Sequence, residues 1–310
     1  MAEKDQTTSP LTIAQLLLGM GLFGSATPLS KIIGEHFSVF TASFMRMAIA
    51  IVVLAPFAWM MTDRFAKMQR SDWWVILAIS IFGMVGFTAT MLFGMRLTTG
   101  VIGSTIMSAT PAVTAVAAVV FLGAAMNLRK AGALALAVLG IAAINLLRAD
   151  GGGPSNAPLL GAALVAFAVC LEAAYTLLSR KLSDGISSLE TTLAASLVAA
   201  PIFVALALLF DPQPFDLSGA STGAWFALAF WGGATGGLAP VLWYNGVRKA
   251  PGALTAGAMS VMPLSALALS YVVLGEAFRW SHLLGFGLVF LGLLLMIVEH
   301  TRAHDDGGVS

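Results

Sequence analysis

The sequence predicts an all-α integral membrane protein with ten transmembrane helices, arranged as two inverted five-helix repeats. Three observations predict it: the composition, the spacing of apolar stretches and an internal repeat. The 310 residues are 58% hydrophobic and 10% charged, with a mean hydropathy of +0.91, whereas a soluble domain carries about 25% charged residues. A chain this apolar cannot cover itself with polar surface, so its expected solvent is lipid. The net charge is +1 without a large basic cluster, so nucleic acid is not an expected partner.

Apolar stretches long enough to cross a bilayer occur ten times, because a membrane helix needs about 20 such residues. Short connections hold most of the charge. The predicted spans are Leu11–Ile33, Phe37–Met61, Trp73–Met95, Thr99–Gly123, Ala131–Leu147, Leu159–Arg180, Ser187–Phe210, Ser221–Val247, Gly252–Gly275 and Ser281–Glu299.

The internal repeat relates two stretches 152 residues apart without a gap. Thirteen identities fall within positions 93–142, where chance in so biased a composition gives roughly one in ten. The recurring residues are Gly94, Arg96, Gly100, Met107, Ser108, Pro111, Val120, Leu122, Gly123, Ala125, Leu136, Leu139 and Gly140, which return as Gly246, Arg248, Gly252, Met259, Ser260, Pro263, Val272, Leu274, Gly275, Ala277, Leu288, Leu291 and Gly292.

Each half contains five spans, an odd number, so the second half must enter the membrane from the opposite side. Secondary transporters use such inverted repeats, since two similar halves can exchange conformations; the alternative is a duplicated bundle without transport. The predicted segments are a cytoplasmic tail (1–10), a first repeat (11–148), a flexible linker (149–158), a second repeat (159–299) and a cytoplasmic C-terminal tail (300–310).

The basic residues predict that both termini are cytoplasmic, because inner loops carry an excess of lysine and arginine. The polar N-terminus lacks a cleavage site, so the first span is interpreted as retained. The predicted inner loops hold Lys4, Arg64, Lys67, Arg70, Arg129, Lys130, Arg180, Lys181, Arg248, Lys249 and Arg302; the outer loops hold only Lys31, Arg96, Arg148 and Arg279.

Two prolines, Pro111 and Pro263, lie at the middle of spans four and nine. A proline inside a helix frees the carbonyl four residues earlier, here that of Met107 or Met259, and in hydrocarbon that group must find a partner. Ser108 and Ser260 are adjacent and could supply hydroxyls, as could water. A symmetric pair favours a hinge beside a central cavity over a static kink.

Ionisable residues inside a membrane are candidates for function. Glu172 is the deepest carboxylate and could hold a substrate ammonium or carry a proton; alternatively it forms a salt bridge inside the bundle, for instance to Arg46, which we interpret as structural. Further candidates for a pocket that takes a bulky or aromatic solute are Tyr175, Trp231, Phe87, Met91, Met107, Met259, Ser108 and Ser260, although packing explains each one alone.

The sequence does not support an enzymatic function. It contains no HExxH, GxSxG or P-loop motif, and its four histidines lie at span ends or in tails. No catalytic residue, cofactor or metal site is predicted.

A mid-helix proline followed by a terminal Leu-Gly or Leu-Gly-Glu occurs in both halves, together with paired glycines in the next spans and an arginine in the second span. These features are Pro111 with Leu122-Gly123, Pro263 with Leu274-Gly275-Glu276, the glycine pairs Gly132/Gly140 and Gly285/Gly292, and Arg46. With them the chain resembles the drug/metabolite transporter superfamily, EamA-like branch, and within it the YddG-type inner-membrane exporters of aromatic amino acids. Phe23 stands where the family usually has tryptophan, and Ala124 replaces the first-half acid. The small multidrug members have a first-span glutamate that is absent here.

The resemblance implies a secondary exporter of amino acids, aromatic or bulky, or of related small metabolites, working by alternating access in the inner membrane with a proton as a potential coupling ion. The alternatives are a multidrug or cation exporter of the same superfamily, in which Glu172 would couple flux to protons, and a membrane scaffold that does not transport.

Overall fold

The computed structural model describes residues 9–59, 65, 68–123, 128–146, 157–179, 181–183, 185–247, 249–250 and 252–307. Within these residues every regular element is a helix. Seven helical stretches are long and apolar enough to cross a membrane, and Ala131–Ala143, Val261–Leu274 and Trp280–Leu295 are shorter apolar helices. The predicted ten-span count therefore stays a prediction. Most of the predicted linker and the first eight residues lie outside the described residues.

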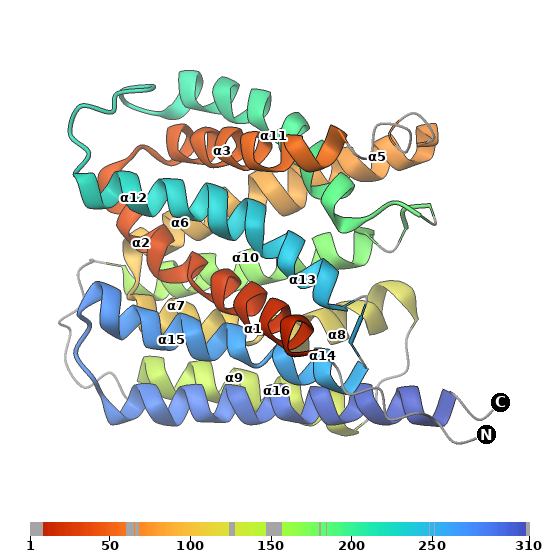
Figure 1. Cartoon of the computed structure of the whole chain (residues 1–310). Coiled ribbons are helices and arrows are strands. Elements are labelled where there is room, and N and C mark those ends of the chain that lie inside the picture. Colours follow the sequence, from red (N-terminus) through yellow and green to blue (C-terminus); the bar gives the residue numbers. More distant parts are fainter. Residues whose placement is uncertain are drawn as a thin grey trace.

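The helices lie side by side and run between two ends of one bundle (Figure 1). The helix α1 begins, and α16 ends, at the same end of this bundle. The elements are α1 (Pro10–Gly24), α2 (Ala26–His36), α3 (Val39–Trp59), α5 (Arg70–Ala78), η1 (Ile79–Gly86), α6 (Phe87–Leu97), α7 (Gly100–Met107), α8 (Thr110–Leu122), α9 (Leu128–Leu146), α10 (Pro158–Ser179), α11 (Ser188–Phe210), α12 (Thr222–Phe230), η2 (Trp231–Leu238), α13 (Ala239–Val247), α14 (Gly252–Ala258), α15 (Val261–Leu274) and α16 (Trp280–Gly307).

Irregular turns recur at the spacing of the sequence repeat. The π-helix η1 runs from residue 79 to 86 and η2 from 231 to 238, so both ends differ by 152 residues. The α-helix is also interrupted at residues 108–109 and 259–260. Gly123 and Gly275 end α8 and α15 with left-handed φ angles of 66° and 64°, a conformation that favours glycine. The two halves thus share local backbone geometry as well as residue identities.

The helices α9 and α16 pack antiparallel through glycines. Gly140 of α9 lies against the Gly285 carbonyl, and a Cβ at Gly292 of α16 would lie 2.8 Å from the Ala133 carbonyl. The sequence repeat relates these two contacts to each other. Gly140 corresponds to Gly292, and Ala133 corresponds to Gly285. Small residues let backbones approach this closely in membrane proteins.

Side chains from distant segments cap helix ends at the end of the bundle opposite both termini. Asp211 follows α11 and accepts hydrogen bonds from the Thr41 amide and hydroxyl in α3, each at 2.8 Å. Glu276 follows α15 and accepts from the amides of Gly100 and Val101, which begin α7. These contacts supply partners for helix N–H groups that no intrahelical carbonyl can reach.

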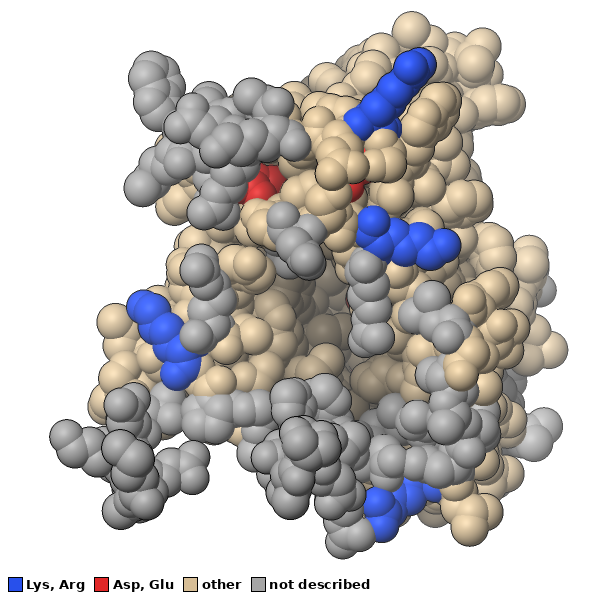
Figure 2. All heavy atoms as spheres, turned by 90° about the vertical axis from the view of Figure 1, so that its right-hand side faces the viewer, with Lys and Arg blue, Asp and Glu red and all other residues tan. Residues whose placement is uncertain are grey.

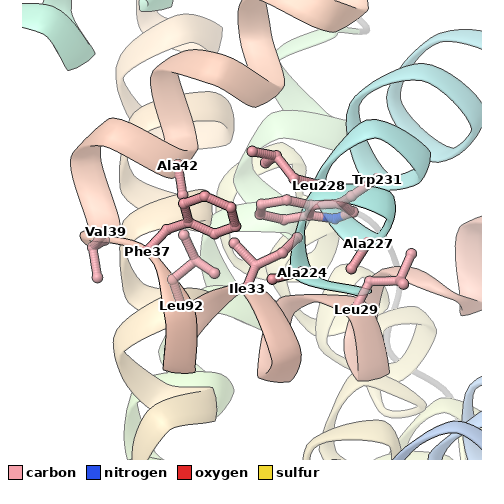
Figure 3. Close-up of a cluster of buried hydrophobic side chains, with 10 residues drawn as sticks. All are labelled: Leu29, Ile33, Phe37, Val39, Ala42, Leu92, Ala224, Ala227, Leu228 and Trp231. Atoms are coloured by element: carbon pink, nitrogen blue, oxygen red, sulfur yellow. The ribbon is translucent and has the colours of Figure 1, made fainter. Parts of the chain in front are cut away.

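The largest buried cluster at this end fills the space between α2, α3, α6, α12 and η2 (Figure 3). Trp231 is 1% exposed and lies in this cluster beside Leu228. The ring of Phe37, also in the cluster, meets Trp225 edge-on with centroids 5.3 Å apart. Trp231 is therefore enclosed by apolar side chains at the start of η2.

The helix α16 extends past the predicted span boundary at Glu299 to Gly307. No proline or glycine interrupts the chain between Glu299 and Gly307, and glycine is the poorest helix former after proline.

Candidate functional site

Arg46 lies in the first half of α3, and its hydrogen-bond donors are only partly satisfied. Its Nη1 donates to the Thr88 hydroxyl at 2.9 Å, and its guanidinium carbon lies 4.4 Å from the Trp231 ring centroid. Its Nε is buried and has no hydrogen-bond partner in the described part of the chain. A buried donor without a partner is costly, which makes Arg46 a binding candidate and not only the structural residue that the sequence suggested.

Glu172 lies on α10, on the other side of the span formed by α5, η1 and α6. Its Oε2 lies 3.0 Å from the Thr110 hydroxyl. Among the described residues the ion pair found is Lys31–Glu35 at 3.1 Å, so the considered Glu172–Arg46 salt bridge does not form. Tyr175, one turn further along α10, packs on Gly83 of η1, where a Cβ would lie 2.8 Å from the Tyr175 Cβ.

Arg46 and Glu172 lie at similar depth beside the same span. Thr88, which bonds Arg46, is two residues from Gly86. A Cβ at Gly86 would lie 3.1 Å from the side chain of Leu171, the residue before Glu172. The span that contains η1 thus separates a cation and an anion near the middle of the bundle.

At the first predicted hinge, the carbonyl that the proline frees is bonded by Thr110 and not by the expected Ser108. Pro111 leaves the Met107 carbonyl without an amide, and the Thr110 hydroxyl donates to it at 2.7 Å. The Ser108 hydroxyl instead donates to the Ser104 carbonyl at 2.7 Å, because a hydroxyl in a helix reaches the preceding turn.

The break at the second predicted hinge also leaves its serine bonded elsewhere. The Met259 carbonyl accepts from the Met262 amide at 3.3 Å, and the Ser260 hydroxyl donates to Gly257 at 2.7 Å. Pro263 is buried in α15. Hinge motion at either break stays a prediction.

The predicted apolar lining residues separate into three places. Phe87, Met91 and Met107 pack in one cluster with α10. Trp231 lies under Arg46, whereas Met259 is 41% exposed. The structure therefore gathers three of these residues near Glu172 and leaves Met259 apart from them.

The end of the bundle on the right of Figure 1 is hollowed near its centre, and lysine and arginine side chains are spread over this face (Figure 2). The described basic residues near the helix ends here are Arg70, Arg129, Lys181 and Lys249. The opposite end carries the capping contacts of Asp211 and Glu276.

Sequence reasoning missed Thr88 and Thr110, although both hydroxyls contact the intramembrane charges. A threonine in a membrane helix normally bonds its own backbone, so its type and position carry no signal for a long-range partner. It also missed the capping role of Glu276, for which the Leu-Gly-Glu motif was a usable signal.

Glu276 is enclosed at the junction of α15 and α7. Burial raises the pKa of its carboxyl, and the amides of Val101 and Gly100 and the charge of Lys31 oppose that rise. Because hydrogen bonds to charged groups contribute about 1.5–3 kcal/mol, we expect Glu276→Gln to lower the melting temperature in detergent by several degrees. Glu35→Gln, which removes only the exposed partner of Lys31, is the control and should change the melting temperature by about a degree or less. Equal shifts for the two variants would contradict the capping role.

Comparison with known proteins agrees with this fold. The model of the EamA-like transporter family matches the chain twice, over residues 10–146 and 159–298. The uncharacterized transporter YetK of Bacillus subtilis (strain 168) is 31% identical over 284 residues, covering 92% of this chain and 86% of YetK. YyaM, an uncharacterized transporter of the same organism, is 28% identical over 291 residues, covering 92% and 93%.

A solved crystal structure has a TM-score of 0.61 at 16% identity and covers 91% of this chain and 98% of its own. At that identity the likeness shows the fold alone.

The apolar helical bundle and these matches define a multi-pass membrane protein that transports a solute. The chain belongs to the EamA-like transporter family, of the drug/metabolite transporter superfamily, and is not an enzyme.

Proposed function

We propose that this protein is a secondary exporter of zwitterionic amino acids with aromatic or bulky side chains, working by alternating access between two inverted five-helix repeats. It resides in the inner membrane with both termini cytoplasmic. Support for the inverted repeat comes from the antiparallel, exchanged contacts of α9 and α16, and from η1 and η2 at equivalent positions. A two-fold axis in the membrane plane makes equivalent helices antiparallel.

The observation that carries the substrate class is the pair of opposite charges held apart inside the bundle. Arg46 has an unpartnered Nε, and Glu172 contacts a hydroxyl instead of a cation. A zwitterion offers a carboxylate to the guanidinium of Arg46. Its ammonium would reach Glu172 only after the span that contains η1 has moved, because that span separates the two charges in this conformation. Phe87, Met91 and Met107 lie near Glu172 and offer adaptable apolar surface for a bulky side chain.

The test is counterflow in proteoliposomes preloaded with tryptophan. External tryptophan should exchange, whereas tryptamine, which lacks the carboxylate, and indole propionate, which lacks the amine, should not. If tryptamine exchanges as fast as tryptophan, the protein is a cation exporter and not an amino-acid exporter. If no amino acid, amine or metabolite of a broad panel crosses the membrane, the remaining hypothesis is a membrane scaffold that does not transport.

A further inference from the structure

The hydroxyl of Thr110 stands between two acceptors. It lies 2.7 Å from the Met107 carbonyl and 3.0 Å from Oε2 of Glu172. A hydroxyl has one proton to donate and can accept as well. It can therefore satisfy the Met107 carbonyl fully only if Glu172 is protonated and donates its own O–H to the Thr110 oxygen. An ionised Glu172 accepts only, and it competes with Met107 for the single Thr110 proton.

The Met107 carbonyl has particular need of this proton. Pro111 has no N–H, so the usual amide four residues later is missing at this position. A buried carbonyl without a partner costs free energy in an apolar interior. The helix break between α7 and α8 is therefore fully hydrogen-bonded in one protonation state of Glu172 and not in the other.

The second half of the chain shows that the fold does not require this arrangement. The position equivalent to Thr110 is Met262, 152 residues later, and it has no hydroxyl. There the Met259 carbonyl is satisfied by the Met262 amide at 3.3 Å. A break of the same kind thus forms without a hydroxyl at this position, so the Thr110–Glu172 pair has a role other than forming the break.

We propose that Glu172 is a proton-binding site and that Thr110 transmits its protonation state to the break between α7 and α8. Proton uptake stabilises the conformation described here, and proton loss frees the Met107 carbonyl and shifts α8 relative to α10. The biological role of this switch, the coupling of solute export to a proton gradient, rests on the proposed function. The switch itself can be tested without any substrate.

Few other ionisable groups face Glu172. The elements packed against α10 are α5, η1, α6, α7 and α8. Their charged residues are Arg70 and Asp72 at the start of α5 and Arg96 in the last turn of α6, all near the ends of the bundle. Tyr175 is the titratable neighbour on α10 itself. Arg46 lies beyond the span that contains η1.

The experiment reads the proton and the helix break separately, in purified full-length protein in nanodiscs. Infrared difference spectra between acid and alkaline pH detect the carbonyl band of a protonated buried carboxyl group. Spin labels report the distance between α8 and α10. They are attached to cysteines introduced at Val120 and Phe167, whose side chains are 68% and 54% exposed, respectively. The single natural cysteine, Cys170, is replaced by serine in this background.

Wild type should show both the titrating band and a pH-dependent distance. Glu172→Gln should lose both signals. Thr110→Val should keep the band and lose the distance change, and Thr110→Ser should restore that change. Thr105→Val is the matched control, because its hydroxyl donates to the Val101 carbonyl in α7 at 2.9 Å and contacts no carboxylate; it should keep both signals.

A band that persists in Glu172→Gln would overturn the assignment of the proton site. A distance change that survives in Thr110→Val would overturn the relay through Thr110. If both signals behave as expected but no solute crosses proteoliposomes, the proton switch stands and the proposed transport function fails.

Discussion

Replacing Arg46 by glutamine is expected to slow counterflow of tryptophan by about 10- to 100-fold. A hydrogen bond to a charged group contributes about 1.5–3 kcal/mol, and 1.4 kcal/mol is about a factor of ten. The guanidinium already has a partner in Thr88 and an aromatic neighbour in Trp231. The slower counterflow would therefore come from losing the N–H groups of Arg46 that remain available to a ligand, above all the unpartnered Nε.

Two comparisons make this expectation specific. Arg279→Gln removes an exposed arginine outside the helices and should leave counterflow unchanged. Arg46→Lys keeps the charge but loses the planar donor geometry, so it should recover only part of the rate. Normal tryptophan counterflow in Arg46→Gln, at wild-type levels of folded protein, would remove Arg46 from the substrate site.

Replacing Gly24 by alanine is expected to cause the largest loss of stability among single-methyl changes. A Cβ at Gly24 would overlap the Ser265 hydroxyl and the Met262 carbonyl of α15 and would lie 3.0 Å from the Ala266 amide. Overpacking of this kind costs about 1–3 kcal/mol, and backbone atoms cannot rotate away from it. The melting temperature in detergent should fall by several degrees, at about 2–4 °C per kcal/mol for a domain of 150–250 residues.

Gly21, one turn earlier in α1, provides the matched control. No atom lies within 4 Å of a Cβ built at Gly21, and alanine is the better helix former by about 1 kcal/mol. Gly21→Ala should therefore keep or raise the melting temperature. If both variants melt alike, the close approach of α1 and α15 is not what makes Gly24 necessary.

The sequence repeat was the strongest guide to the fold, because it predicted features at defined positions. It indicated weakened helices at Pro111 and Pro263, and the α-helix is interrupted just before both. It could not predict η1 and η2, since apolar residues at π-helical and α-helical spacing look alike in a chain that is apolar on all sides. The glycines of η2 accommodate α3: Gly232 lies against Ile49 and Gly237 against Val53.

The candidate site was less predictable than the fold. Glu172 could be chosen from the sequence because a carboxylate within an apolar span is rare and costly. Its partner could not be chosen, since Thr110 is 62 residues away and threonine carries no such signal. Arg46 was undervalued for a similar reason: only three-dimensional contacts reveal which of its donors are occupied.

The Glu276 cap has a consequence for the proposed two-state cycle. If the two halves were identical, the inward-facing and outward-facing forms would be mirror equivalents with equal free energies. Glu276 bonds the start of α7, whereas the equivalent residue in the first half is Ala124, which has no carboxylate to offer the start of α14. The Glu276 contact therefore has no counterpart in the first half, so the two forms of the proposed cycle would differ in free energy even without solute or gradient.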